Sequence, residues 1–285
     1  MTWSSARTRR IRPLLGTFVE IRLDPGGRGD GPGDIDAAFA EIEAVHRLMS
    51  WHEPGSDVSR LNREAAHHPV RVDARTWNVL CLAREMSEAS RGLFDVTVEP
   101  WLRRFGILPG EVGDELFAAT RGDYRDIELL SGRRVRFTRP LRLCLDGIAK
   151  GYAVDRAVEC LRGRGARAGA VNAGGDLRVF GPRPQPLHLR DPRDACRLLP
   201  LPPLRNEAAA TSAACFARSG TNCNPILDPR SKAPAPARSV TVIARRCAVA
   251  DALTKVVALL PKPGGCLERF NARALVLEPE TAAPA

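Results

Sequence analysis

Segments with strand periodicity and segments with helix periodicity do not alternate regularly along this chain. Residues 15–23 alternate apolar and polar side chains, which is typical of a half-buried strand. Asp34 and Asp73 are predicted to be the N-caps of two helices that follow one another, and further strand-like stretches come later. A doubly wound parallel sheet needs strict alternation. The sequence therefore predicts an α+β fold with mixed sheets and flanking helices, in a single domain over residues 1–285.

The apolar pattern predicts which helical side chains reach the core. Residues 133–145, 168–181 and 240–244 have the composition of strands. The middle stretch should form either two short strands or one strand that is broken by a double-glycine turn. The proline-rich segment 181–237 is expected to be mostly loop with short strands, and residues 279–285 a frayed tail. The predicted core positions of two N-terminal helices and one C-terminal helix are Ile35, Phe39, Ile42, Val45, Met49, Val79, Ala83, Met86, Ala89, Ala250, Leu253, Val257 and Leu260.

The net charge of +10 raises the question of nucleic-acid binding. Only four of the 43 basic residues are lysine, the arginines are spread over most of the chain, and aromatic residues make up 5%. A protein that binds nucleic acid normally concentrates its positive charge and combines it with aromatic side chains. The composition instead indicates an arginine-rich surface that attracts anionic ligands, and no nucleic-acid partner is expected.

Cysteine usage and hydropathy favour a cytoplasmic protein. No stretch of about 18 apolar residues is present, so no membrane span is expected. The eight cysteines include no C-x-x-C pair, and the five histidines make no zinc-binding spacing with them. As the sequence stands, its N-terminus does not have the pattern of a signal peptide. We therefore expect buried, reduced thiols.

The segment LCLDGIAKGYAVD at residues 143–155 carries the clearest chemical signal. An apolar strand is expected to run into Asp146 and Gly147, and a helix then starts with small residues and Lys150. A glycine lets a ligand approach the backbone, the N-terminus of a helix attracts phosphate, and a lysine adds a full positive charge. The segment predicts a phosphate-binding turn, and the alternative is a tight strand–helix turn with Lys150 in solvent.

A second segment, ADALTK at residues 250–255, places a carboxylate and a hydroxyl on one face of a helix. Asp251, Thr254 and Lys255 stand at i, i+3 and i+4 near the start of that helix. Carboxylate and hydroxyl oxygens are suitable ligands for a hard cation such as Mg²⁺. The alternative is that Asp251 only stabilises the helix through its dipole.

Two shorter segments are less specific. In RGLFDVTVEP, residues 91–100, we expect a short strand on which Asp95, beside Phe94, either binds N–H groups of a ligand or holds a turn. In ILDPR, residues 226–230, Asp228 is expected to begin a turn.

Taken together and in this order, these segments resemble the flavin transferase (ApbE) family over nearly the whole chain. The resemblance implies an ApbE-like, T-fold-like architecture with an FAD cleft between two lobes. Besides the four segments above, it is carried by RPLLGTFVEI (12–21), MSWHEPGSDVSRLN (49–62), VNAGGDLRVFG (171–181), RDP (190–192), ATS (210–212) and VTVIA (240–244).

The resemblance implies an FAD:protein FMN transferase, which moves FMN from FAD to a Ser or Thr hydroxyl of a partner flavoprotein and releases AMP. Asp251 would be catalytic and would hold Mg²⁺ together with Thr254, Lys255 and the backbone at Gly147. This cation would neutralise the charge that develops on the diphosphate. The residues implied as FAD contacts are Met49, Leu93, Phe94, Asp95, Cys144 and Lys150.

The sequence departs from the family pattern at three positions. The family usually has a histidine before the I-x-D-P stretch, where this chain has Pro225. It tends to have threonine where this chain has Lys255, and an acidic residue where it has Cys144, for which Asp146 is a substitute. One hypothesis is an active transferase in which Asp146 or Asp228 takes the hydroxyl proton. The others are a flavin-binding accessory protein with weak or no transfer, and a hydrolase that splits FAD to FMN and AMP.

Overall fold

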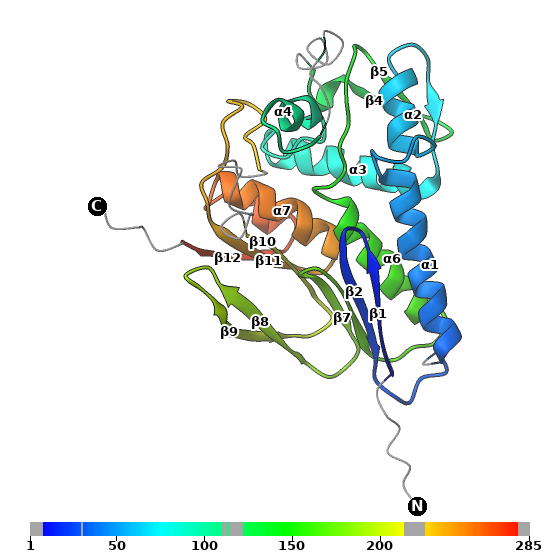
Figure 1. The fold of residues 1–285 in the computed structure, drawn as a ribbon, viewed down its shortest axis with the longest axis vertical. Helices are drawn as coiled ribbons and strands as arrows, with labels where there is room; N and C mark the ends of the chain where they lie inside the picture. Colours follow the sequence, from blue (N-terminus) through cyan, green and yellow to red (C-terminus); the bar gives the residue numbers. More distant parts are fainter. Residues whose placement is uncertain (1–7, 30, 110–112, 114–121, 214–225, 279–285) are drawn as a thin grey trace, which may run out of the picture.

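The structure is a computed structural model, and it describes residues 8–29, 31–109, 113, 122–213 and 226–278. Within these ranges a seven-stranded sheet, two smaller sheets and several helices pack together (Figure 1). The strands are β1 (Thr8–Leu14), β2 (Thr17–Leu23), β3 (Val70–Arg71), β4 (Ile127–Leu130), β5 (Arg134–Phe137), β6 (Gly169–Ala173), β7 (Asp176–Phe180), β8 (Gln185–Asp191), β9 (Asp194–Leu204), β10 (Ala208–Ala213), β11 (Ser239–Ala244) and β12 (Arg273–Leu277). The helices are α1 (Pro32–Met49), α2 (Asp57–Glu64), α3 (Ala74–Ala89), α4 (Glu99–Arg104), the 3₁₀ turn η1 (Tyr124–Asp126), α6 (Ala149–Gly163), α7 (Cys247–Leu259) and α8 (Gly265–Arg269).

The large sheet has the strand order β1-β2-β6-β7-β10-β11-β12, and every neighbouring pair in it is antiparallel. The second sheet, β3-β5-β4, and the hairpin β8–β9 are antiparallel as well. The α+β class that the sequence predicts is confirmed.

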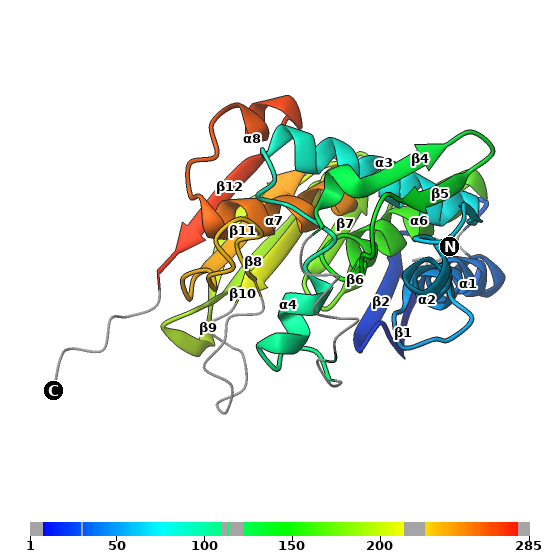
Figure 2. The same cartoon turned by 90° about the horizontal axis from the view of Figure 1, so that it is seen from above.

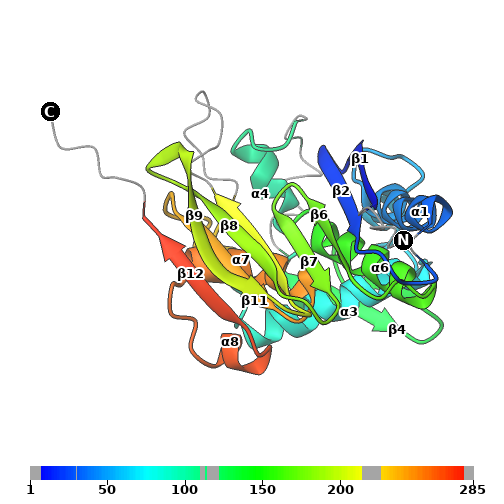
Figure 3. The same ribbon diagram turned by 90° about the horizontal axis from the view of Figure 1, so that it is seen from below.

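Helices cover one face of the large sheet. Helices α6 and α7 lie on the sheet, α1 packs beside α6, and α3 lies over α7 and α1 (Figures 1 and 2). The hairpin β8–β9 packs over part of the opposite face (Figure 3). The apolar side chains between this hairpin and the sheet are Ala170, Val179, Leu204, Ala209 and Ile243, with Leu177 and Leu187 beside them.

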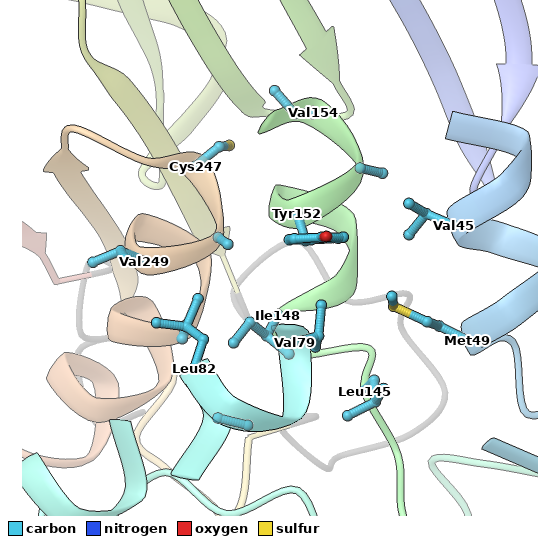
Figure 4. Close-up of a cluster of buried hydrophobic side chains, with 14 of the residues drawn as sticks. Val45, Met49, Val79, Leu82, Leu145, Ile148, Tyr152, Val154, Cys247 and Val249 are labelled. Atoms are coloured by element: carbon cyan, nitrogen blue, oxygen red, sulfur yellow. The ribbon is translucent and has the colours of Figure 1, made fainter. Parts of the chain in front are cut away.

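The main core lies between the sheet and the helices. Almost all of the helical positions predicted from periodicity are buried, but Ala89 is only partly buried. Leu260 is exposed because α7 ends at Leu259, so that prediction is wrong. One part of this core joins the C-terminal end of α1 to α3, α6 and α7 (Figure 4). The side chains labelled there are Val45, Met49, Val79, Leu82, Leu145, Ile148, Tyr152, Val154, Cys247 and Val249.

The two predicted helix starts differ in outcome. Asp73 is the N-cap of α3, and its carboxylate accepts a hydrogen bond of 2.8 Å from the backbone N–H of Arg75. Helix α1 instead begins at Pro32, two residues before the predicted N-cap. Asp34 therefore lies inside the first turn, where its carboxylate accepts from the N–H of Gly31 at 3.2 Å. Asp34 is thus residue N3 of the helix, and its side chain binds back to the N-cap residue Gly31.

Two predicted strands are absent from the described structure. Residues 93–98 form turns because the carboxylate of Asp95 accepts hydrogen bonds from both the backbone N–H and the hydroxyl of Thr97. Residues 141–145 are extended without a strand partner. The backbone of Leu143 bonds instead to the side-chain amide of Asn62, through its N–H at 2.7 Å and its carbonyl at 3.1 Å.

The segment 181–237 contains more strand than expected, since β8, β9 and β10 lie in it. Strand β9 pairs only with β8 in the described structure, so prolines such as Pro200 remove few ladder hydrogen bonds. The double glycine before β7 makes the predicted turn between β6 and β7. Among the described residues, no helix combines the length and the apolar surface that a membrane crossing requires.

Candidate functional site

Two cavities meet at the turn that precedes α6. The larger has a volume of about 460 Å³ and lies between the end of α1, the β1–β2 turn and the start of α6, with Met49 and Lys150 in its wall. The smaller, of about 200 Å³, is lined by Phe94 and Lys255 among others. Asp146 lines both cavities, so the turn that was predicted to bind phosphate is the junction between them.

Local contacts shape this junction. The backbone N–H groups of Ile148 and Ala149 both donate to the carbonyl of Leu145, at 3.0 and 2.8 Å, which carries the turn directly into α6. A Cβ atom at Gly147 would lie 3.5 Å from the ring of Phe94 and 3.6 Å from Cε of Lys255. The turn therefore faces the smaller cavity closely. A ligand that spans both cavities must pass over it.

Trp51 was missed at the sequence level. Its indole Nε1–H donates to Oδ2 of Asp146 at 3.3 Å, and its ring lines the larger cavity. The guanidinium of Arg103 lies 5.1 Å from the centre of that ring. The segment MSWHEPGSDVSRLN contained the signal, because an aromatic side chain directly after a helix end is well placed to line a cleft. Only Met49 was singled out there.

Helices α6 and α7 approach closely beside the junction. A Cβ atom at Gly151 would lie 2.5 Å from the carbonyl oxygen of Cys247, so only glycine fits at this position. The N–H of Gly151 donates to Oδ2 of Asp251 at 3.0 Å. In return, the carboxylate of Asp155 accepts from the first N–H groups of α7, those of Cys247 and Ala248, at 2.8 and 3.0 Å. Each helix thus holds the other through a buried carboxylate.

Four charged side chains gather where these helices meet the sheet. They are Lys150 from α6, Asp176 from the start of β7, and Asp251 and Lys255 from α7. The two carboxylates are 1% and 2% exposed. Nζ of Lys150 lies 3.4 Å from Oδ2 of Asp176, an oxygen that makes no well-formed hydrogen bond. Asp176 was not singled out in the sequence, because its place in this group depends on the sheet.

Burial and neighbouring charges shift the pKa values of Asp176 and Lys150. Burial and the negative charge of Asp251 raise the pKa of Asp176 to about 7, against the opposing effect of Lys150 and Lys255. Burial alone would lower the pKa of Lys150, but the charges of Asp176 and Asp251 outweigh it and the pKa is raised overall. Lys150 therefore stays charged. The alternative of a lysine in open solvent does not hold, since the Lys150 side chain is 33% exposed.

The predicted metal ligands Asp251, Thr254 and Lys255 form a closed set of contacts. Lys255 Nζ donates to Oδ1 of Asp251 and, at 3.0 Å, to the carbonyl oxygen of the same residue. The hydroxyl of Thr254 is fully buried and donates to that carbonyl at 2.7 Å. Within the part of the chain that the structure describes, no three His, Cys, Asp or Glu side chains gather in a way that suits a metal ion. These contacts do not fit a resident Mg²⁺.

Four predicted FAD contacts, Leu93, Phe94, Asp95 and Cys144, line the smaller cavity. Besides Thr97, the carboxylate of Asp95 accepts from the backbone N–H of Tyr124 at 3.1 Å, and burial raises its pKa. Asp95 therefore holds a turn, the second of its two predicted roles, and this turn presents Leu93 and Phe94 to the cavity. Cys144 also lines the cavity, and burial raises the pKa of its thiol well above the usual value.

The two predicted bases lie in different surroundings. Asp146 is exposed at the junction. The carboxylate of Asp228 accepts from the N–H, Nε and Nη2 of Arg230 at 2.8, 3.1 and 3.0 Å, and these hydrogen bonds lower its pKa. Its neighbours Leu227 and Pro229 line the smaller cavity. Pro225 lies outside the described residues.

Comparisons with known proteins point in one direction. Residues 15–272 match the sequence model of the ApbE family. The chain is 28% identical over 260 residues to an FAD:protein FMN transferase of Vibrio cholerae, with 85% of this chain and 78% of that protein covered. It is 27% identical over 288 residues to an FAD:protein FMN transferase of Treponema pallidum, with 90% and 80% covered.

Solved structures share the fold. The ApbE protein of Thermotoga maritima is 26% identical and superposes with a TM-score of 0.80, over 96% of this chain and 97% of that one. The apo form of the flavinyl transferase ApbE of Pseudomonas stutzeri also gives a TM-score of 0.80, over 97% and 92%. At 24% identity, the second likeness concerns the fold alone.

Proposed function

Because this chain belongs to the ApbE family, we propose that it is an FAD:protein FMN transferase, which moves FMN from FAD to a Ser or Thr hydroxyl of a partner flavoprotein and releases AMP. The observation that carries this proposal is the pair of cavities joined at Asp146, with Lys150 in one wall and Lys255 in the other. FAD matches this arrangement, because it consists of two ring systems that are joined by a diphosphate. The diphosphate would lie over the turn, between the two ammonium groups.

The chain's own residues would bind and orient FAD in three parts. Met49 and Trp51 would contact one ring system in the larger cavity, and Leu93 and Phe94 the other in the smaller cavity. Gly147 allows the diphosphate to approach the backbone. This arrangement predicts that FAD binds more tightly than FMN, because FMN fills only one cavity.

In the transfer step, the hydroxyl oxygen of the acceptor attacks the phosphorus of the FMN phosphoryl group. The bond from this phosphorus to the bridging oxygen breaks, AMP leaves with the electron pair, and the hydroxyl proton passes to a base. Asp146 is the better placed base, because it lines both cavities, whereas Asp228 is held by Arg230. Lys150 and Lys255 would stabilise the negative charge on the diphosphate oxygens. Mg²⁺ does not fit the contacts of Asp251, so the two ammonium groups would neutralise the diphosphate without it.

Two observations favour a second candidate, the flavin-binding accessory protein. Lys255 engages the carboxylate that the family resemblance assigns to the metal, and Pro225 replaces the histidine of the family. Such a protein would bind FAD in the same cavities without cleaving it. The cytoplasmic location and the partner flavoprotein stay predictions.

The test uses the purified protein, FAD and a flavoprotein that carries a Ser or Thr flavinylation site. AMP is measured by chromatography and acceptor-bound flavin by fluorescence after denaturing electrophoresis. The transferase should give equal amounts of both products. Asp146→Asn should keep FAD binding and slow transfer by roughly 10²- to 10⁴-fold, whereas Asp194→Asn, an exposed control on β9, should change neither.

The other outcomes separate the alternatives. AMP together with free FMN identifies the hydrolase, and FAD binding without AMP identifies the accessory protein. A protein that binds no flavin under any condition contradicts all three.

A further inference from the structure

The carboxylate and the carbonyl of Asp251 are already engaged by the ammonium group of Lys255 and by neighbouring donors. One carboxylate oxygen accepts from Lys255 and the other from the backbone N–H of Gly151. The carbonyl oxygen of Asp251 accepts from both Lys255 and Thr254. Mg²⁺ requires near-octahedral oxygen ligands at about 2.0–2.1 Å. To enter, it would have to displace a positively charged ammonium group from the same oxygens and then remain beside it.

Lys255 is also placed to reach a ligand. Its side chain is 24% exposed and lines the smaller cavity next to the Gly147 turn. An ammonium group has three N–H donors. Two of them point to Asp251, on its carboxylate and on its carbonyl, which leaves the third for an oxygen in the cavity. The ammonium therefore links a buried carboxylate to the junction where an anion would lie.

Lysine is rare among the basic residues of this chain, so its presence at positions 150 and 255 is informative about the charge that the site needs. Lysine occurs four times among 43 basic residues, and two of the four, Lys150 and Lys255, line the two cavities that meet at the junction. A compact ammonium is a point charge, which is the form of charge that a small cation supplies.

We propose that the ammonium group of Lys255 takes the place of a divalent cation, so that this protein binds the diphosphate of FAD without metal. The inference rests on the proposed function, since it concerns the same FAD site. Lys255 holds its position through Asp251 and Gly151, and with Lys150 it neutralises the diphosphate.

The first test is FAD binding, followed by flavin fluorescence and by calorimetry in EDTA and in MgCl₂. The dissociation constant of the wild type should differ by less than about twofold between the two conditions. Lys255→Met keeps the length of the side chain and removes its charge, and should weaken binding in EDTA by at least about tenfold. Lys262→Met, at an exposed position, is the matched control and should bind like the wild type.

The second test restores the residue expected from the family resemblance. Lys255→Thr should bind FAD weakly in EDTA and at least about tenfold more tightly with MgCl₂. Calorimetry with MgCl₂ alone should detect binding to Lys255→Thr and none to the wild type. Circular dichroism of each variant checks that it is folded.

The outcomes separate this inference from the proposed function. If the wild type binds FAD only with Mg²⁺, or binds Mg²⁺ by itself in the calorimeter, the inference is overturned and the proposed function stands. If Lys255→Met or Lys255→Thr binds FAD in EDTA as tightly as the wild type, Lys255 does not have the cationic role. If the wild type binds FAD in neither condition, it is the proposed function that fails.

Discussion

Replacing Asp176 with asparagine should make the protein lose less stability than the wild type as the pH rises from 5 to 8. Asp176 is 1% exposed, and its nearest positive charge, on Lys150, lies 3.4 Å away without a well-formed hydrogen bond. Burial and the negative charge of Asp251 raise its pKa to about 7, although Lys150 and Lys255 act in the opposite direction. The folded protein therefore favours the neutral acid. Asparagine resembles that acid in size and stays neutral at every pH.

The sign and the size of the effect follow from proton linkage. In the unfolded chain this carboxyl ionises near pH 3.9, so between about pH 4 and pH 7 only the folded protein holds the proton. Its contribution to stability is fully present below the unfolded pKa and is lost as the pH rises through 7. Each pH unit in this window changes the free energy of unfolding by about 1.4 kcal/mol. From pH 5 to pH 8 the contribution of Asp176 should fall by roughly 3 kcal/mol.

The assay is urea unfolding, followed by circular dichroism at pH 5, 6, 7 and 8 without FAD. The wild type should lose roughly 3 kcal/mol more than Asp176→Asn over this range. Asp194→Asn serves as the control, because Asp194 also begins a strand but is exposed. It should follow the wild type. If Asp176→Asn loses stability with pH as steeply as the wild type, the carboxyl of Asp176 is ionised throughout and the reasoning is refuted.

Three further predictions concern the two helices and the two cavities. Gly151→Ala should lower the free energy of unfolding by about 1–3 kcal/mol because its Cβ meets backbone of α7. Gly163→Ala, in open space on α6, should leave the free energy of unfolding nearly unchanged. Equal losses in the two variants would refute the close approach of α6 and α7 at Gly151. Trp51→Phe should remove most of the quenching of tryptophan fluorescence that FAD causes on binding, and Trp77→Phe should leave this quenching unchanged. Equal quenching in both variants would mean that Trp51 lies far from the ligand. Calorimetry should give tighter binding of FAD than of FMN, and equal affinities would argue against a ligand spanning both cavities.

The helices could be predicted because their signals are local. Apolar side chains at steps of three and four require one buried face, and the structure buries that face in α1, α3 and α7. The strands of segment 181–237 could not be predicted in this way. The hairpin β8–β9 is stabilised by its packing on the large sheet, through contacts such as Leu187 and Leu204, and that packing overrides a proline-rich composition.

The site was predictable where its residues are neighbours in sequence. The Asp146–Gly147 turn and Lys150 lie within one segment, and Asp251 and Lys255 are one helical turn apart. Asp176 joins them only because β6 and β7 bring the start of β7 to the two helices. Spacing alone also left open whether Asp251 would hold a metal or only stabilise the helix through its dipole, and it did not show that the carboxylate would bind Lys255. Burial of Asp251 explains this contact, since an unpaired buried carboxylate is costly and the ammonium is its nearest cation.

Lys255→Arg should therefore fail to replace lysine, although arginine is by far the commoner basic residue in this chain. A guanidinium is a planar fork, whereas Lys255 must donate to the carboxylate and the carbonyl of Asp251 and keep a third donor for the cavity. We expect FAD binding in EDTA to weaken at least about tenfold despite the unchanged charge. Binding equal to the wild type would mean that positive charge suffices and that the position of the ammonium is unimportant.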